Sequence, residues 1–178
     1  MNKDIESVLL SAEEIEAKVS EIGAKISQDY AGKEPIFIGV LKGCWIFMAD
    51  LMRHVDVNCS VDFMAVSSYV GTSSTGAVKI NKDLSQDIKG KDVIIVEDIL
   101  DSGVTLNYLK QYLQMREPAS IAIATLLDKP ARRKADVFAD YSCFNIPDAF
   151  VVGYGLDYNE KYRNIPFIGV LKPEVYSN

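Results

Sequence analysis

Short apolar runs that alternate with amphipathic segments constrain the fold of this chain more than any other feature. The main runs occupy residues 35–41, 57–67, 93–96 and 121–127, and shorter ones lie near 150–152 and 167–171. Runs of this length predict β-strands, and a strand without polar side chains is covered on both faces of its sheet. Covering both faces requires helices on each side, so the sequence predicts an α/β fold with a mostly parallel central sheet flanked by helices.

Three amphipathic segments predict these helices. Residues 11–29 begin with the spacing of a capping box, Ser11 followed by Glu14. Apolar residues then recur every three or four positions, as on one face of a helix; they are Ile15, Val19, Ile22 and Ile26. Two more helices are expected over residues 45–54 and 104–115.

The composition is that of a single globular domain, residues 1–178, with an acidic surface. A net charge of −6 and a pI of about 4.8 disfavour binding to nucleic acid. The largest basic group, Arg132-Arg133-Lys134, is expected to be a solvated turn. The sequence contains no membrane-length apolar run and no secretory signal, so we expect a cytoplasmic protein without a membrane partner. Three cysteines without a C-x-x-C pair argue against disulfides or structural zinc.

Acidic and small residues follow the predicted strand at 93–96, where open α/β sheets bind their ligands. The segment runs Glu97-Asp98-Ile99-Leu100-Asp101-Ser102-Gly103-Val104-Thr105. A turn from a strand into a helix exposes backbone N–H groups at the positive end of the helix, which suits a phosphate. The Ser102 and Thr105 hydroxyls add donors, and Gly103 allows close approach of the backbone.

Three carboxylates beside an anion site have two explanations. In the first, Glu97 and Asp98 accept hydrogen bonds from sugar hydroxyls, Mg²⁺ bridges the protein and a polyphosphate, and Asp101 exchanges a proton. In the second, the segment is a solvated acidic turn that caps the helix. The acidic pair running directly into a small-residue loop favours the first, and so predicts a site for a sugar phosphate with Mg²⁺.

Residues 93–105, VIIVEDILDSGVT, resemble the phosphoribosyl pyrophosphate (PRPP) signature of the type I phosphoribosyltransferases. An aspartate at Asp101 is the variant of the 6-oxopurine enzymes, the hypoxanthine-guanine phosphoribosyltransferases. Other matching stretches are Leu41-Lys42-Gly43, Ser68-Tyr69, Ser74-Thr75-Gly76, Lys129 and residues 146–163, IPDAFVVGYGLDYNEKYR. The resemblance spans roughly residues 36–171. It implies a type I phosphoribosyltransferase fold with a core of roughly 36–140, a small hood from the N- and C-terminal segments, and a homodimer or homotetramer.

For the sugar, the phosphate and the metal, the resemblance implies these roles. Glu97 and Asp98 hold the ribose hydroxyls and the waters bound to Mg²⁺, and Asp157 lies near a second Mg²⁺. The loop Asp101-Ser102-Gly103-Val104-Thr105 wraps the 5′-phosphate. Asp101 is also the acid/base that faces N7 of the purine.

For the base and the leaving group, the resemblance implies a second set of residues. Lys129 donates to the purine O6, Phe150 stacks on the base, and the Val151 backbone reads its edge. Ile99 and Asp157 complete the purine site. Pyrophosphate binds Arg163 and the Lys42-Gly43 turn, with a cis peptide between Leu41 and Lys42. Ser68 and Tyr69 belong to a mobile lid, formed by the small and polar residues 68–76.

These roles together imply purine salvage: Mg²⁺-dependent transfer of 5-phosphoribosyl from PRPP to N9 of hypoxanthine, and also of guanine, which forms IMP or GMP and pyrophosphate. One alternative is a PRPP-binding regulatory protein of the same fold, which would need a basic face for nucleic acid. Another is a receiver-type signalling domain, which would need the acidic pair at the end of its first strand. The acidic pI speaks against the first, and the position of Glu97-Asp98 speaks against the second.

Overall fold

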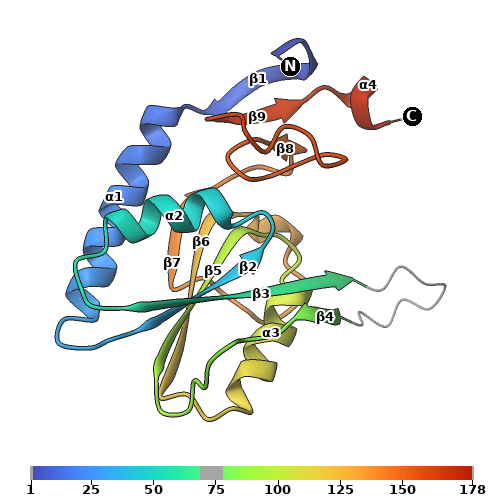
Figure 1. The fold of residues 1–178 in the computed structure, drawn as a ribbon. Helices are drawn as coiled ribbons and strands as arrows, with labels where there is room; N and C mark the ends of the chain where they lie inside the picture. The colour runs from blue at the N-terminus through green and yellow to red at the C-terminus, as the bar shows by residue number, and fades with distance from the viewer. Residues whose placement is uncertain (1, 69–77, 178) are drawn as a thin grey trace.

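The computed structural model of the protein describes residues 2–68 and 78–177. Its central sheet has six strands in the order β4-β3-β2-β5-β6-β7 (Figure 1). Their bounds are Ile36–Leu41 (β2), Ser60–Ser68 (β3), Val78–Lys82 (β4), Asp92–Leu100 (β5), Ser120–Asp128 (β6) and Tyr141–Asn145 (β7). All neighbours are parallel except β4, which pairs antiparallel with β3 at one edge. The predicted mostly parallel α/β fold is therefore confirmed.

Helices cover both faces of this sheet. Helices α1 (Ala12–Asp29) and α2 (Trp45–Arg53) bury their apolar side chains in one cluster, and α3 (Val104–Gln114) contributes to another. Strand β5 sends Ile94 and Val96 into the first cluster and Val93 and Ile95 into the second. This alternation explains why residues 93–96 of the strand are wholly apolar: each face of the strand meets a helix layer there.

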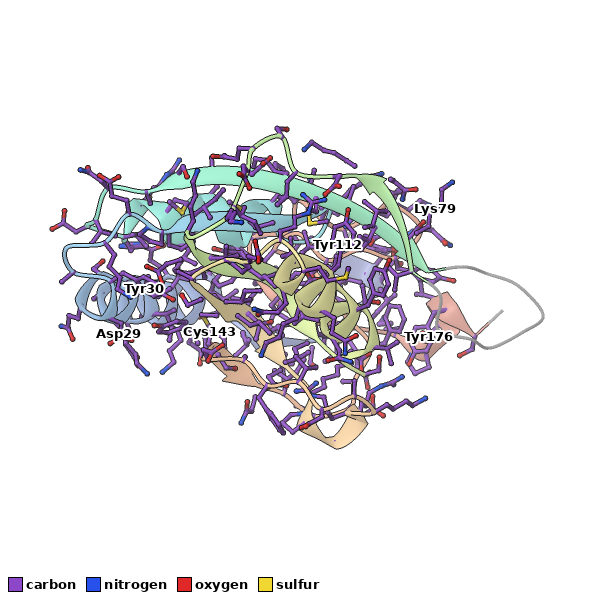
Figure 2. The ribbon with its side chains drawn as sticks, turned by 90° about the horizontal axis from the view of Figure 1, so that it is seen from below. Asp29, Tyr30, Lys79, Tyr112, Cys143 and Tyr176 are labelled. Carbon is purple, nitrogen blue, oxygen red and sulfur yellow. The ribbon has the colours of Figure 1, made fainter. Side chains whose placement is uncertain are left out.

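The first helix begins where its capping box predicts. The Glu14 N–H donates to Ser11 Oγ at 3.2 Å, and the Ser11 N–H donates to Glu14 Oε2 at 2.8 Å. The predicted apolar face is buried, with Ile15 and Val19 at 1% and 0% exposure. Tyr30, just after this helix, and Tyr176, near the C-terminus, lie at opposite ends of the molecule in Figure 2.

Some predicted boundaries were wrong. The strand expected at residues 93–96 continues to Leu100, because Ile99 and Leu100 still pair with β6. Glu97 and Asp98 therefore lie within the strand and not in a loop after it. The run at 57–67 becomes a strand only from Ser60. The lid residue Tyr69 lies outside the described residues, and of Ser68 only the strand backbone is described.

The N- and C-terminal segments pair with each other in a second, antiparallel sheet of order β1-β9-β8. Its strands are Ile5–Leu10 (β1), Val151–Val152 (β8) and Ile168–Leu171 (β9). The short elements η1 (Asn2–Asp4), η2 (Pro130–Arg132) and α4 (Pro173–Tyr176) complete the fold. In Figure 1 the small sheet lies over one end of the central sheet. Segments from both ends of the chain therefore lie above that end of the central sheet. No helix among the described residues is long and apolar enough to cross a membrane.

Candidate active site

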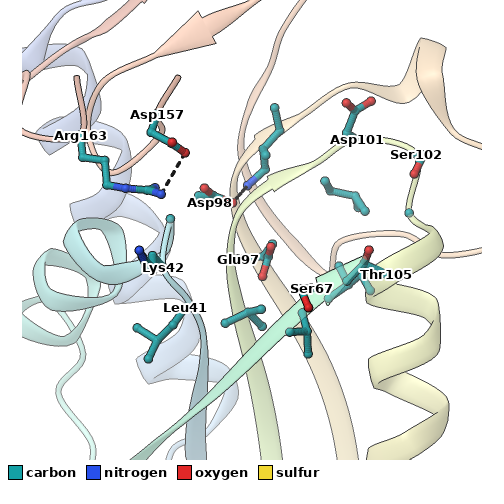
Figure 3. Close-up of a pocket in the computed structure, with 17 residues that line it drawn as sticks. Leu41, Lys42, Ser67, Glu97, Asp98, Asp101, Ser102, Thr105, Asp157 and Arg163 are labelled. Atoms are coloured by element: carbon teal, nitrogen blue, oxygen red, sulfur yellow. Dashed lines mark hydrogen bonds and ion pairs between the residues drawn. The ribbon is translucent and has the colours of Figure 1, made fainter. Parts of the chain in front are cut away.

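A cavity of about 320 Å³ opens at the carboxyl ends of β2 and β5. It is bounded by the turn after β2, the end of β5, the turn into α3 and the segment after β8 (Figure 3). The predicted site residues that line it are Lys42, Gly43, Glu97, Asp98, Ile99, Asp101, Ser102, Gly103, Thr105, Asp157 and Arg163. Val104 is the exception in its loop: it does not line the cavity, and its side chain is exposed. Ser67 of β3 lines the cavity and was not predicted.

The phosphate end of this cavity is the turn from β5 into α3. Gly103 is the N-cap of α3 and has a φ of 79°, which favours glycine. A Cβ added there would lie 2.6 Å from a methyl group of Val137, so a larger residue would disturb the turn. The Ser102 and Thr105 side chains project near the start of the helix in Figure 3. Hydroxyls and N–H groups at a helix N-terminus form an anion site.

Arg133 supports this turn from behind. Its guanidinium donates to the backbone oxygens of Leu100 and Asp101 and pairs with the carboxylate of Asp128. Its side chain is only 12% exposed. The prediction of a solvated turn for this basic group was therefore wrong at Arg133. The signal that could have found it is a basic side chain within a few residues of the end of β6, the strand beside β5.

The acidic pair near the end of β5 is only partly compensated: Asp98 Oδ1 accepts from the Ile99 N–H at 2.8 Å. Burial, and then the charge of Asp98, raises the pKa of Glu97 well above its usual range. Burial also raises the pKa of Asp98 to about 6. Glu97 Oε2 is buried and has no hydrogen-bond partner among the described residues. A Cβ on Gly43 would lie 1.6 Å from Asp98 Oδ2, so only glycine lets the turn after β2 approach this carboxylate.

These carboxylates fit hydroxyl donors or a hydrated cation. Among the described residues there is no group of three or more histidine, cysteine, aspartate or glutamate side chains placed to hold a metal ion. A Mg²⁺ ion held here would therefore take most of its ligands from a substrate and from water, as Mg²⁺ usually does in phosphate sites. The unpartnered Glu97 oxygen is the observation that supports such a ligand.

The far end of the cavity carries two cations, both paired. The Leu41–Lys42 peptide is cis, as the resemblance implies. Lys42 Nζ lies 3.0 Å from Glu160 Oε2. Arg163 Nη2 lies 3.0 Å from Asp157 Oδ1 and 3.1 Å from Glu160 Oε1 (Figure 3 shows the pair with Asp157). The hydrogen bonds from Lys42 and Arg163 hold the pKa of Glu160 below its usual range. Glu160, which the sequence did not predict, thus neutralises both cations of the expected pyrophosphate site.

A second cavity, of about 360 Å³, shares Ile99 and Asp101 with the first. The other predicted purine residues that line it are Lys129, Phe150 and Val151. Asp157, also expected at the purine, lines the first cavity instead. Arg132, Asp148, Leu156 and Tyr176 line the second cavity and were not predicted.

Two side chains of this second cavity are fixed by their neighbours. Lys129 is 6% exposed, and its Nζ donates to the Ala149 carbonyl at 2.7 Å. Phe150 is 39% exposed, stacks on Tyr176 with ring centroids 4.7 Å apart, and meets the edge of Tyr158. Phe150 is therefore not part of the core; it lines the cavity together with Tyr176, which stacks on one of its faces.

The two cavities suit the two halves of a nucleotide. The first offers helix N–H groups, hydroxyls, carboxylates and cations, which bind a sugar carrying phosphates. The second offers an aromatic ring, an aliphatic side chain and a buried lysine, which bind a flat polar ring. Asp101 stands where they meet, so a bond formed between their contents would form beside its carboxylate.

Comparisons with known proteins agree with this geometry. A family model described as the phosphoribosyl transferase domain matches residues 7–159. The hypoxanthine-guanine phosphoribosyltransferase of Bacillus subtilis (strain 168) is 56% identical over 179 residues, covering 100% of this chain and 99% of that protein. A crystal structure of a hypoxanthine phosphoribosyltransferase from Staphylococcus aureus (tetragonal form) has a TM-score of 0.97 at 55% identity, over 100% of this chain and 97% of that one.

A more distant relative carries a ligand. Hypoxanthine phosphoribosyltransferase from Trypanosoma cruzi, in complex with the product IMP, has a TM-score of 0.93 at 42% identity and covers 98% of each chain. The matches to these three relatives extend over 98–100% of the chain and therefore include both cavities. The chain accordingly belongs to the phosphoribosyltransferase family, and within it to the hypoxanthine-guanine phosphoribosyltransferases.

Proposed function

We propose that this purine-salvage phosphoribosyltransferase joins PRPP to hypoxanthine or guanine beside Asp101. One observation carries the proposal: Asp101 lines both the cavity suited to a sugar phosphate and the cavity suited to a base. The products would be IMP or GMP and pyrophosphate. The regulatory alternative finds no support, because the relatives named above are enzymes and the chain is acidic.

In the first cavity, Glu97 and Asp98 would accept hydrogen bonds from the ribose hydroxyls. The loop from Asp101 to Thr105 would hold the 5′-phosphate through its backbone N–H groups and its two hydroxyls, with Val104 contributing only backbone. A Mg²⁺ ion held at Glu97, Asp98 and Asp157, in part through its waters, supplies positive charge to the pyrophosphate group when bound. The orphaned oxygen of Glu97 supports this assignment.

In the second cavity, Phe150 and Ile99 would hold the base between them, and the Val151 backbone would read its edge. Lys129 has three donors and uses one on Ala149, so it can also donate to a 6-oxo group. A 6-amino group is itself a donor and could not accept this hydrogen bond from the buried ammonium. Asp101 would hold or move the proton at N7 while N9 attacks the sugar.

The leaving pyrophosphate would meet the Lys42-Gly43 turn and Arg163. Negative charge grows on this group as the bond to the sugar breaks, and fixed donors that face the charge lower the barrier. Lys42 and Arg163 would first have to give up Glu160. Closure of a lid carrying Ser68 and Tyr69, which would exclude water, stays a prediction.

Assembly and location also remain proposals. An apolar surface hollow of about 430 Å³ includes Trp45 and Val61, which are 50% and 46% exposed. Exposed apolar surface of this kind supports the expected homodimer or homotetramer. Light scattering would distinguish the two assemblies from a monomer. The cytoplasmic location is likewise an expectation from composition.

A spectrophotometric assay with PRPP, Mg²⁺ and one base at a time tests the proposal. Hypoxanthine and guanine should be converted, and adenine should be converted at least about 100-fold less efficiently, because it leaves the Lys129 donor unpaired. Preferential use of adenine, or PRPP binding without transfer to any purine, would contradict it.

A further inference from the structure

We infer that Arg132 is a positioning residue for the acid/base step: it ties Asp101 to Asp148 across the second cavity and so fixes which oxygen Asp101 presents to the base. This inference rests on the proposed role of Asp101. It concerns a residue that the sequence indicated only as part of a solvated turn. The ion pairs that the structure gives this arginine carry the inference.

The guanidinium of Arg132 uses two different nitrogens on two different carboxylates. Its Nε lies 2.8 Å from Asp101 Oδ1, and its Nη1 donates to Asp148 Oδ1 at 2.9 Å. Asp148 thus accepts a hydrogen bond, whereas Asp101 Oδ1 is buried, has no hydrogen bond among the described residues, and is held by the ion pair. Because a guanidinium is planar and rigid, the two contacts tie the positions of the two carboxylates to each other. The hydrogen bond from Arg132 also holds the pKa of Asp148 below its usual range.

The three residues come from three separate walls of the cavity. Asp101 belongs to the turn between β5 and α3, Arg132 ends η2, and Asp148 lies between β7 and β8. Lys129, just before η2, donates to Ala149 next to Asp148. Lys129 Nζ also lies 3.9 Å from Asp148 Oδ1. Three contacts thus join the loop of residues 129–132 to the segment at 148–149, and Arg132 connects this loop to Asp101.

The contact determines what Asp101 can offer to a substrate. Arg132 engages Oδ1, which leaves Oδ2 as the oxygen for N7 of the base. The Asp101 side chain is 39% exposed overall, but its Oδ1 is buried and has no hydrogen bond among the described residues, so the charge of Arg132 is the contact that holds this oxygen in place. Misplacing a catalytic group by about 1 Å can cost up to about 10²-fold in rate. The pair is half-exposed at Arg132 as well, and such pairs contribute little to folding. The effect should therefore appear in turnover and not in stability.

Four variants test the inference. Arg132→Ala should lower kcat about tenfold while the KM for hypoxanthine changes less than about threefold. Arg132→Lys keeps the charge but replaces two bonding nitrogens by one, so it should recover part of the loss. Asp148→Asn weakens the anchor and should lower kcat less than Arg132→Ala. Arg53→Ala, at an arginine 79% exposed on α2, is the matched control and should keep wild-type values.

A double-mutant cycle separates this inference from the proposed function. If Arg132 acts through Asp101, Arg132→Ala should cost nothing further in the Asp101→Asn background. Wild-type kcat in Asp101→Asn alone would overturn the proposed role of Asp101, and the inference with it. Slowed turnover in Asp101→Asn, together with wild-type kcat in Arg132→Ala or losses that add, would overturn the inference only. An unfolding midpoint within about 2 °C of wild type in each variant shows that kinetics and not folding is measured.

Discussion

Single residues in this site are held by contacts that a substrate would have to use or replace. Lys129 is buried and has one donor occupied by Ala149. Lys42 and Arg163 both contact Glu160. Glu97 keeps one buried oxygen without a partner among the described residues. In the free protein, the lysine proposed to read the base is therefore held in place, the two cations proposed to bind pyrophosphate are neutralised, and the carboxylate proposed to face the sugar keeps an oxygen without a partner.

Lys129→Ala should remove the preference for 6-oxopurines. The buried ammonium is the group we expect to donate to O6, and a lost charged hydrogen bond costs about 1.5–3 kcal/mol. The ratio of kcat/KM for hypoxanthine to that for adenine should fall by about 10- to 100-fold. Lys134→Ala, at an exposed lysine of the same loop, should leave the ratio unchanged. An unchanged ratio in Lys129→Ala would exclude Lys129 as the reader of O6.

Glu160→Gln should strengthen the binding of pyrophosphate. The Glu160 carboxylate occupies both Lys42 and Arg163, and a neutral amide would compete less with an anion for them. We expect the Kd for pyrophosphate, measured by calorimetry, to fall about three- to tenfold, with Glu34→Gln as an exposed control. Unchanged or weaker binding would show that Glu160 does not hold the cations in competition with the ligand.

At the scale of elements, a buried carboxylate on β3 links this strand to the segment that follows the edge strand β4. Asp62, on β3, accepts from the backbone N–H groups of Phe63 at 2.8 Å and Ser85 at 2.7 Å. Burial raises the pKa of Asp62, but these bonds and Lys82 outweigh it and hold the pKa below its usual range. Asp62 thereby joins the segment after β4 to its neighbour β3, near the start of β3.

The lowered pKa of Asp62 determines how stability depends on pH. A carboxylate with a depressed pKa in the folded state stabilises the protein above its unfolded pKa, near 3.9, and this stabilisation is lost as the pH falls through the folded pKa. Asp62→Asn should lower the free energy of unfolding at pH 7 by about 1–3 kcal/mol and flatten its decline below about pH 4. Denaturant titrations across that range, with Asp56→Asn as control, measure this. An equally steep acid decline in both variants would contradict it.

The elements also show what periodicity can predict. The capping box and the buried stripe placed α1 within one residue, because both signals are local. The end of β5 was misplaced because polar residues suggested a loop, whereas pairing with β6 keeps the strand extended. The sequence patterns did not predict strands β1, β4 and β7. Strand β1 exists through its pairing with β9, more than a hundred residues away, and no local pattern reports such a partner.

At the scale of the whole molecule, the ends of the chain complete the site. The resemblance placed Glu97, Asp98, Asp101 and Arg163 in one region, and the structure brings them into one cavity. It did not indicate Tyr176, which reaches the second cavity because β9 runs beside β8 and α4 follows directly. Tyr176 then stacks on Phe150. Contacts of this kind depend on how two distant segments meet, so they follow from the fold and not from a motif.

The two cavities meet at Asp101. For a base to reach a sugar there, the Asp101 carboxylate, the turn that carries it and the small sheet above the site must all be in place. Asp101→Asn keeps the shape of the side chain and removes its ability to exchange a proton. The most direct measurement is kcat for IMP formation in this variant, alongside its Kd for PRPP. The account predicts a kcat lower by about 10²–10⁴-fold with PRPP binding within about threefold of wild type. Turnover at the wild-type rate would contradict it.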